Sequence, residues 1–115
     1  MAQFQLTPEI RKQLFRIYND VNKAVYGFGT NESKIYFVDN MIIFNAHHNR
    51  VPCLMALEQD TPALKEAVDG AIMKVFKARL GERLQEVLGI RPKAVLRDYA
   101  CDQLIAITVV VLADE

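Results

Sequence analysis

The chain has 115 residues, of which 51% are apolar and 24% are charged, and 14 basic residues balance 14 acidic ones to give a formal net charge of zero. This length and composition are typical of a single globular domain, residues 1–115, rather than of a disordered segment. Without excess positive charge the chain lacks the long-range attraction of basic proteins for nucleic acid or anionic lipid. We therefore do not expect nucleic-acid binding.

The N-terminal segment and the cysteines predict a cytoplasmic protein. Residues 1–6 contain neither the basic cluster nor the apolar run of a signal peptide. A chain of this size can bury a core without disulfides, so Cys53 and Cys101 are expected to be reduced thiols. The longest apolar stretch, residues 104–113, is shorter than the roughly 20 residues of a membrane span. We expect no direct membrane insertion, and any association with a membrane should depend on a partner.

An amphipathic helix is predicted from about residue 8 to residue 26. Thr7, Pro8 and Glu9 are residue types that cap a helix, begin it and suit the positive end of its dipole. Apolar residues then recur every three or four positions, at Ile10, Leu14, Ile17, Val21 and Val25. Gly27 can adopt the left-handed conformation that closes a helix, so the helix should end there.

A β-hairpin is predicted to follow this helix. Residues 34–38 and 41–44 are rich in β-forming side chains, and Asp39 and Asn40 between them suit a tight turn. The second strand should run on to about position 46 or 48 and fade at residues 49–50, and Pro52 bars a central strand beyond it. Residues 53–58 are ambiguous, and a short helical turn is one alternative.

A second, longer helix is predicted over residues 62–88, from a start signal at residues 60–62 to Gly89. At ~1.5 Å per residue it would reach on the order of 40 Å, whereas a compact chain of this length has a radius of gyration of about 13 Å. Its apolar stripe is unbroken, so we expect a second copy of the chain to bury the overhanging part. The expected interface residues are Ile72, Phe76, Leu80 and Leu84, together with Val109 and Val111 of the last predicted strand.

A second hairpin completes the predicted fold. Residues 93–97 form its first strand, residues 98–103 a polar turn, and residues 104–112 a last strand that lacks polar alternation. Such a strand is typical of burial on both faces, so the far side of the sheet also needs a cover. The predicted fold is α+β, helix-hairpin-helix-hairpin (αββαββ), with an antiparallel sheet packed on one long helix in a dimer.

Candidate chemistry centres on His47, His48 and Cys53, which could form a nucleophile–base pair and which, with Cys101 and Asp98 or Asp102, carry groups able to bind zinc. Adjacent residues of a strand point to opposite faces, so the two histidines cannot easily share an ion. A cysteine such as Cys53 more often packs as a small apolar residue. We therefore predict no catalytic residue, no metal and no cofactor, and keep a pocket formed by His47, His48 and Cys53 as the alternative.

The order of these features resembles the MpsC-like family, a small bacterial domain. The resemblance covers about residues 18–112 and includes a Gly-x-Gly segment, a hairpin with an Asp-Asn-x-Ile-Ile turn, a long helix ending at glycine and a closing strand pair. The matching positions are Gly27, Gly29, Lys34, Asp39, Asn40, Ile42, Ile43, Gly89, Val95, Asp98 and Leu112. The chain departs from the family pattern at Thr30, where a proline is usual.

Family members are associated with a membrane-potential-generating, inorganic-carbon-uptake system whose other subunits supply the channel and the zinc chemistry. The resemblance thus implies an accessory protein. We predict a non-enzymatic, cytoplasmic accessory or regulatory module for protein–protein interaction, a homodimer that serves a membrane ion or inorganic-carbon transport system. The alternative is a small-ligand-binding sensor or minor enzyme with a Cys/His pocket between sheet and helices.

Overall fold

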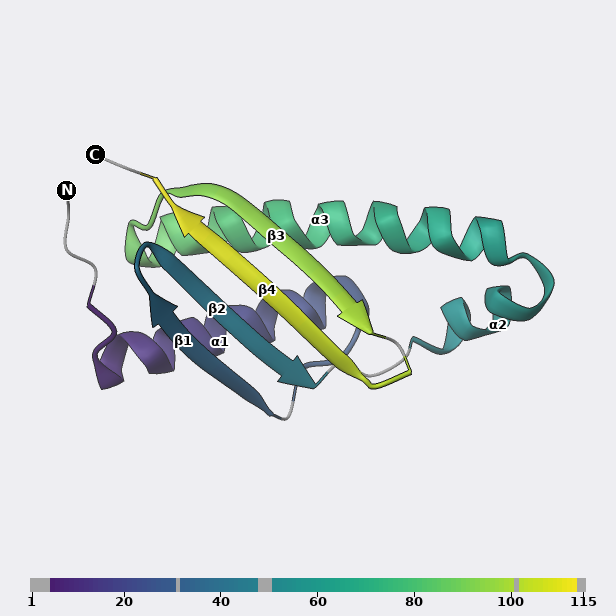
Figure 1. Cartoon of the computed structure of the whole chain (residues 1–115), viewed down its shortest axis with the longest axis horizontal. Helices are drawn as coiled ribbons and strands as arrows, with labels where there is room; N and C mark the ends of the chain where they lie inside the picture. The colour runs from purple at the N-terminus through teal and green to yellow at the C-terminus, as the bar shows by residue number, and fades with distance from the viewer. Residues whose placement is uncertain (1–4, 31, 48–50, 101, 114–115) are drawn as a thin grey trace.

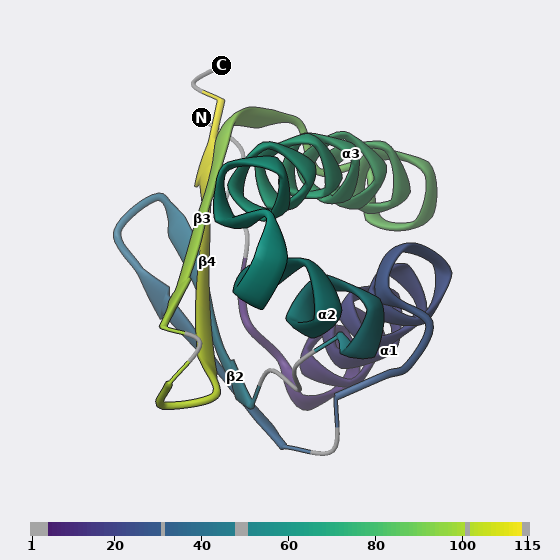
Figure 2. The same cartoon turned by 90° about the vertical axis from the view of Figure 1, so that its right-hand side faces the viewer.

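The structure is a computed structural model, and it describes residues 5–30, 32–47, 51–100 and 102–113. The elements are α1 (Pro8–Tyr26), β1 (Ser33–Val38), β2 (Met41–His47), α2 (Pro52–Asp60), α3 (Pro62–Leu88), β3 (Pro92–Ala100) and β4 (Ile105–Leu112). The strands form one antiparallel sheet in the order β1-β2-β4-β3. Figures 1 and 2 show all three helices on the same side of this sheet.

The predicted α+β class is confirmed, but the predicted arrangement is not. The sheet packs on two helices, α1 and α3, rather than on one, and α2 is an additional helix between the hairpins. Helix α2 has proline in its first turn, lacks a side-chain cap and buries only Leu54 among its residues. A helix this short and this weakly amphipathic leaves little signal in the sequence, which is why residues 53–58 were ambiguous.

Local signals set the ends of α1 and α3 as expected. The Thr7 hydroxyl accepts a hydrogen bond from the Ile10 backbone N–H at 3.1 Å, and Pro8 follows in the first turn. Gly27 and Gly89 close the two helices in the left-handed conformation, with φ of 91° and 67°. The turn between β1 and β2 also lies at the predicted Asp39 and Asn40.

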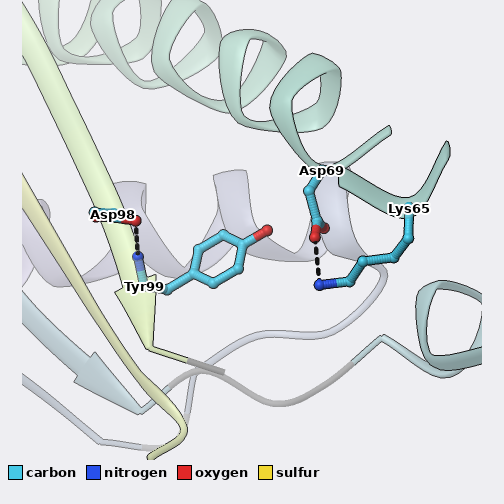
Figure 3. A network of polar contacts seen from close by, with 4 residues as sticks. All are labelled: Lys65, Asp69, Asp98 and Tyr99. Atoms are coloured by element: carbon cyan, nitrogen blue, oxygen red, sulfur yellow. Dashed lines mark hydrogen bonds and ion pairs between the residues drawn. The ribbon is translucent and has the colours of Figure 1, made fainter. Parts of the chain in front are cut away.

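Strand β3 is longer than predicted. Asp98, Tyr99 and Ala100, which the sequence placed in a polar turn, continue the strand and pair with Ile107, Ala106 and Ile105 of β4. Asp98 lies on the outer face, where a polar side chain can remain solvated, and Tyr99 lies on the inner face (Figure 3), so the alternation of the strand continues. Pairing with β4 therefore overrides the local turn signal.

The core lies between the sheet and the two long helices. The Tyr18 ring of α1 stacks on Phe44 of β2 with centroids 4.5 Å apart, and it meets the Phe76 ring of α3 edge-on at 5.8 Å. Leu80 and Leu84 follow Phe76 along α3 at steps of four, and all three are fully buried. Their assignment to an interface between two copies is therefore wrong, because the chain's own sheet and α1 cover this stripe.

Helix α3 is continuous over its 27 residues and gives the molecule its elongated shape, 50 × 25 × 22 Å. Its N-terminal half extends beyond the end of the sheet (Figure 1). Helix α2 packs against that half, so part of the overhang is covered by the same chain. The long helix by itself thus does not require a second copy.

Gly29 and Gly70 offer a matched test of backbone packing. The Asn19 Oδ1 atom accepts a hydrogen bond from the Thr30 backbone N–H at 2.9 Å, and a Cβ atom at position 29 would collide with that Asn19 amide. We expect Gly29→Ala to lower the free energy of unfolding by about 1–3 kcal/mol. Gly70 lies in α3 with open space around it, so Gly70→Ala should raise stability by about 1 kcal/mol. Denaturant titration measures both, and equal effects would contradict the Gly29 contact.

Candidate functional site

The candidate site is the face of the sheet that points away from the helices. In each strand, alternate residues point into the core and are buried, and the residues between them point outward. In Figure 2 no drawn helix lies on this side. We call this surface the open face. Its residues are Lys34, Tyr36, Val38, Met41, Ile43, Asn45, His47, Ala94, Leu96, Asp98, Ala100, Ile105, Ile107, Val109 and Val111.

The strand register arranges the open face in rows that cross all four strands. One row consists of Tyr36, Ile43, Val109 and Leu96, and the row beside it of Val38, Met41, Val111 and Ala94. Both rows are wholly apolar, apart from one phenol hydroxyl. Leu96 is 57% exposed and Tyr36 is 46% exposed. A solvated sheet face normally carries polar residues at these positions, and these two rows carry apolar ones instead.

A third row has opposite charges at its two ends. Lys34 lies on the edge strand β1, and Asp98 lies on the other edge strand, β3, with Asn45 and Ile107 between them. The salt bridges found among the described residues involve neither charge. The Asp98 carboxylate does accept a hydrogen bond from the Tyr99 backbone N–H at 2.8 Å. The open face is therefore apolar over the two rows nearest the β1–β2 turn and carries opposite charges on its two edge strands in the third row.

Strand β4 accounts for much of this exposed apolar surface. The sequence predicted that it is buried on both faces, but the described chain covers only the face that carries Ala106, Thr108 and Val110. Val109 and Val111, two of the predicted interface residues, lie half-buried on the open face. Ile72, another of them, is half-buried on α3. The sheet, and not the buried stripe of α3, presents the uncovered apolar surface.

The opposite face of the sheet buries a cation that the sequence analysis did not identify. Arg97 is 6% exposed, and its Nη1 atom donates hydrogen bonds to the Tyr18 hydroxyl at 2.9 Å and to Thr108 Oγ1 at 2.7 Å. Its guanidinium carbon lies 3.9 Å from the centre of the Phe76 ring. Arg97 lies two residues after Val95, so the alternation of the strand places both on the inner face. This alternation was the signal in the sequence that Arg97 is buried. The residue links β3 and β4 to both long helices.

Beyond Arg97, the inner side of β3 meets the N-terminal half of α3. Figure 3 shows the Tyr99 ring pointing from β3 toward Asp69 and Lys65 of α3. The Lys65 ammonium and the Asp69 carboxylate form an ion pair at 2.7 Å. The two residues of this pair are one turn apart in α3, so the ion pair belongs to the helix itself.

Tyr26, which lies near Arg97, should make the stability of the fold depend on pH. Burial raises the pKa of Tyr26 above its usual value of 10.0, and the nearby Arg97 guanidinium opposes that rise. The folded state therefore favours the neutral phenol, so its contribution to stability is present below pH 10 and is lost as pH rises through the folded-state pKa. We expect Tyr26→Phe to flatten the loss of stability above pH 10. Urea titrations at several alkaline pH values measure this, with Tyr36→Phe as the exposed control; identical pH profiles for Tyr26→Phe and wild type would contradict it.

The residues of the predicted alternative pocket are only partly placed together. His47 borders a wide-open hollow of about 490 Å³ at the end of the sheet, together with Phe15, Lys34 and Asn45. Cys53 is exposed on α2 and does not border this hollow. His48 lies outside the described residues. The hollow therefore does not bring Cys53 and His47 together as a nucleophile and its base.

The residues that the structure describes contain neither a cluster of metal-ligating side chains nor a membrane-spanning helix. No three His, Cys, Asp or Glu side chains come together there in a way that could hold a metal ion. None of the described helices combines the length and hydropathy needed to cross a bilayer.

The fold and the open face define a two-layer α+β protein with one uncovered face of an antiparallel sheet. Comparison with known proteins adds no family: no family model, no curated protein and no solved structure matches the chain. The resemblance to the MpsC-like family therefore rests on the sequence positions given above.

Proposed function

We propose that this protein is a non-enzymatic accessory module that acts by binding protein surfaces and that forms a homodimer. The observation that carries the proposal is the open face, with its two adjacent apolar rows across β1, β2, β4 and β3. Contiguous exposed apolar surface of this kind marks interaction sites in soluble proteins. Burial of a large apolar side chain contributes about 1.5–3 kcal/mol, so covering two such rows favours association.

The process we propose comes from the resemblance to the MpsC-like family. In this proposal the protein works in the cytoplasm and docks on a membrane ion or inorganic-carbon transport system, whose other subunits carry out the chemistry. The neutral net charge agrees with a partner recognised through shape and apolar contact rather than through a strong field.

A photo-crosslinking experiment tests the proposed function. A photoreactive amino acid is placed at Ile43, in the middle of the open face, and at Arg16, an exposed position on α1. In cells that make the protein naturally, we expect discrete adducts from position 43, with a second copy or with another protein, and few from position 16. Equal or negligible adducts from the two positions would contradict an interaction role for this face.

The hollow beside His47 is the observation that favours the alternative, a small-ligand-binding sensor or minor enzyme. Its volume of about 490 Å³ lies within the range of small-molecule sites. A thermal-shift screen of small metabolites should then reveal a ligand that raises the melting temperature of wild type and not of His47→Ala. If every hit stabilises both proteins equally, this alternative is excluded.

A further inference from the structure

We propose that the occupant of the open face is a second copy of this chain, packed sheet against sheet about a two-fold axis that runs along the strands. In this arrangement Lys34 of each protomer faces the partner's Asp98. The inference deepens the proposed function, on which it rests, by naming one partner and its orientation. It starts from the distribution of charge on the open face.

The charged row is self-complementary. Lys34 on β1 and Asp98 on β3 occupy the same level of the sheet, because Lys34 pairs with Asn45, Asn45 with Ile107, and Ile107 with Asp98. They lie on the two opposite edge strands. Both side chains are exposed, and the salt bridges found in the described chain include neither. A partner that carries the same row in the reverse order would satisfy both charges.

A two-fold axis along the strands produces that reversal. The rotation lays β3 of one copy over β1 of the other without changing the level along the strands. Each dimer then contains two Lys34–Asp98 pairs, one at each margin of the interface. At the level of the apolar row, Tyr36 faces the partner's Leu96, and Ile43 faces the partner's Val109. Isologous contact of this kind is the commonest way for identical chains to pair.

The apolar rows suit this packing in size as well. Sheets that pack face to face lie about 10 Å apart with their strands nearly aligned, and their inner side chains interdigitate. Four strands of six to nine residues, spaced ~4.8 Å apart, give the open face a plan area on the order of 500 Å². Protruding side chains add accessible surface to that area, which brings it toward the roughly 800 Å² that each partner buries in a standard interface.

A two-fold axis across the strands is the main competing arrangement. It would lay β1 on the partner's β1 with the ends reversed, and it would bring Lys34 toward the partner's Asp39. Asp39 lies in the β1–β2 turn with φ of 53°, so strand alternation does not direct its side chain onto the open face. Lys34 and Asp98, in contrast, are both strand residues whose outward direction follows from their buried neighbours, Ile35 and Arg97. The axis along the strands therefore matches the charges better.

Charge exchange in the full-length chain tests the arrangement by sedimentation equilibrium. Wild type should be a dimer. Lys34→Asp and Asp98→Lys should each raise the dissociation constant roughly 10-fold or more, because each variant opposes like charges at both margins. The double variant K34D/D98K should return to within about 3-fold of wild type. K34D/D39K is the matched control and should remain weak. Thermal melts of every variant identify any that fails to fold.

The other results would overturn the proposal. One such result is a wild type that is still monomeric at about 100 μM. The others are a K34D/D98K variant whose dimer affinity does not recover, and a K34D/D39K variant whose dimer affinity does. Failure here is distinguishable from failure of the proposed function. If the chain is monomeric but the photoreactive group at Ile43 captures a different protein, the interaction module stands and only self-association is wrong.

Discussion

Leu80→Asp should unfold the protein. Leu80 is 0% exposed and lies in the stripe of α3 that faces the sheet and α1. Truncation of a buried leucine costs about 2–5 kcal/mol, and a carboxylate in the same place adds the cost of burying a polar or charged group without a partner. The sum is comparable with the whole stability of a small domain, about 5–15 kcal/mol. Circular dichroism at 25 °C in buffer should show loss of structure.

Val75→Asp is the control on the same helix. Val75 is 47% exposed, so its replacement should change the free energy of unfolding by no more than about 0.5 kcal/mol. The pair distinguishes two roles of α3. A folded Leu80→Asp variant that had merely become monomeric would restore the original interface hypothesis and contradict the buried position of Leu80.

Arg97→Ala should lower the free energy of unfolding by about 3 kcal/mol or more. The substitution removes the guanidinium that stacks on Phe76 and that bonds to Tyr18 and Thr108, and it leaves a void between sheet and helices. Arg97→Met should stay within about 1 kcal/mol of wild type, because it keeps the stem's packing and removes a buried charge. Denaturant titrations of the two variants give the comparison.

Arg97→Lys separates charge from geometry. A lysine keeps the positive charge but loses the planar group that can stack on a ring while donating two hydrogen bonds. We expect it to be less stable than Arg97→Met. If Arg97→Lys instead matches wild type and Arg97→Met is as unstable as Arg97→Ala, the cation itself, and not the packing of its stem, holds the two layers together.

Much of the secondary structure follows from the sequence because its signals are local. Thr7 and Gly27 bound the first helix, Gly89 ends the long one, and Asp39 and Asn40 form the first turn, all as the residue types predict. A short helical turn at α2 was left as one alternative, and the extra length of β3 was missed. In the first case too few residues carry a pattern, and in the second the pairing with β4 decides.

The candidate site was predictable only in part. Val109 and Val111 were assigned to an interface from their apolar strand, and they lie on the open face. Phe76, Leu80 and Leu84 were assigned with them but belong to the core. Periodicity reveals that a side chain is to be buried. It does not reveal whether the same chain or a partner buries it.

The sequence by itself determined the α+β class, the ends of α1 and α3 and the turn between β1 and β2, since these depend on residues that are neighbours in the chain. Only the tertiary structure decided the strand order β1-β2-β4-β3, the inward position of Arg97 over Phe76 and the face that stays uncovered. These features depend on contacts between residues far apart in the chain. With both long helices on one side of the sheet, an apolar surface is left on the other.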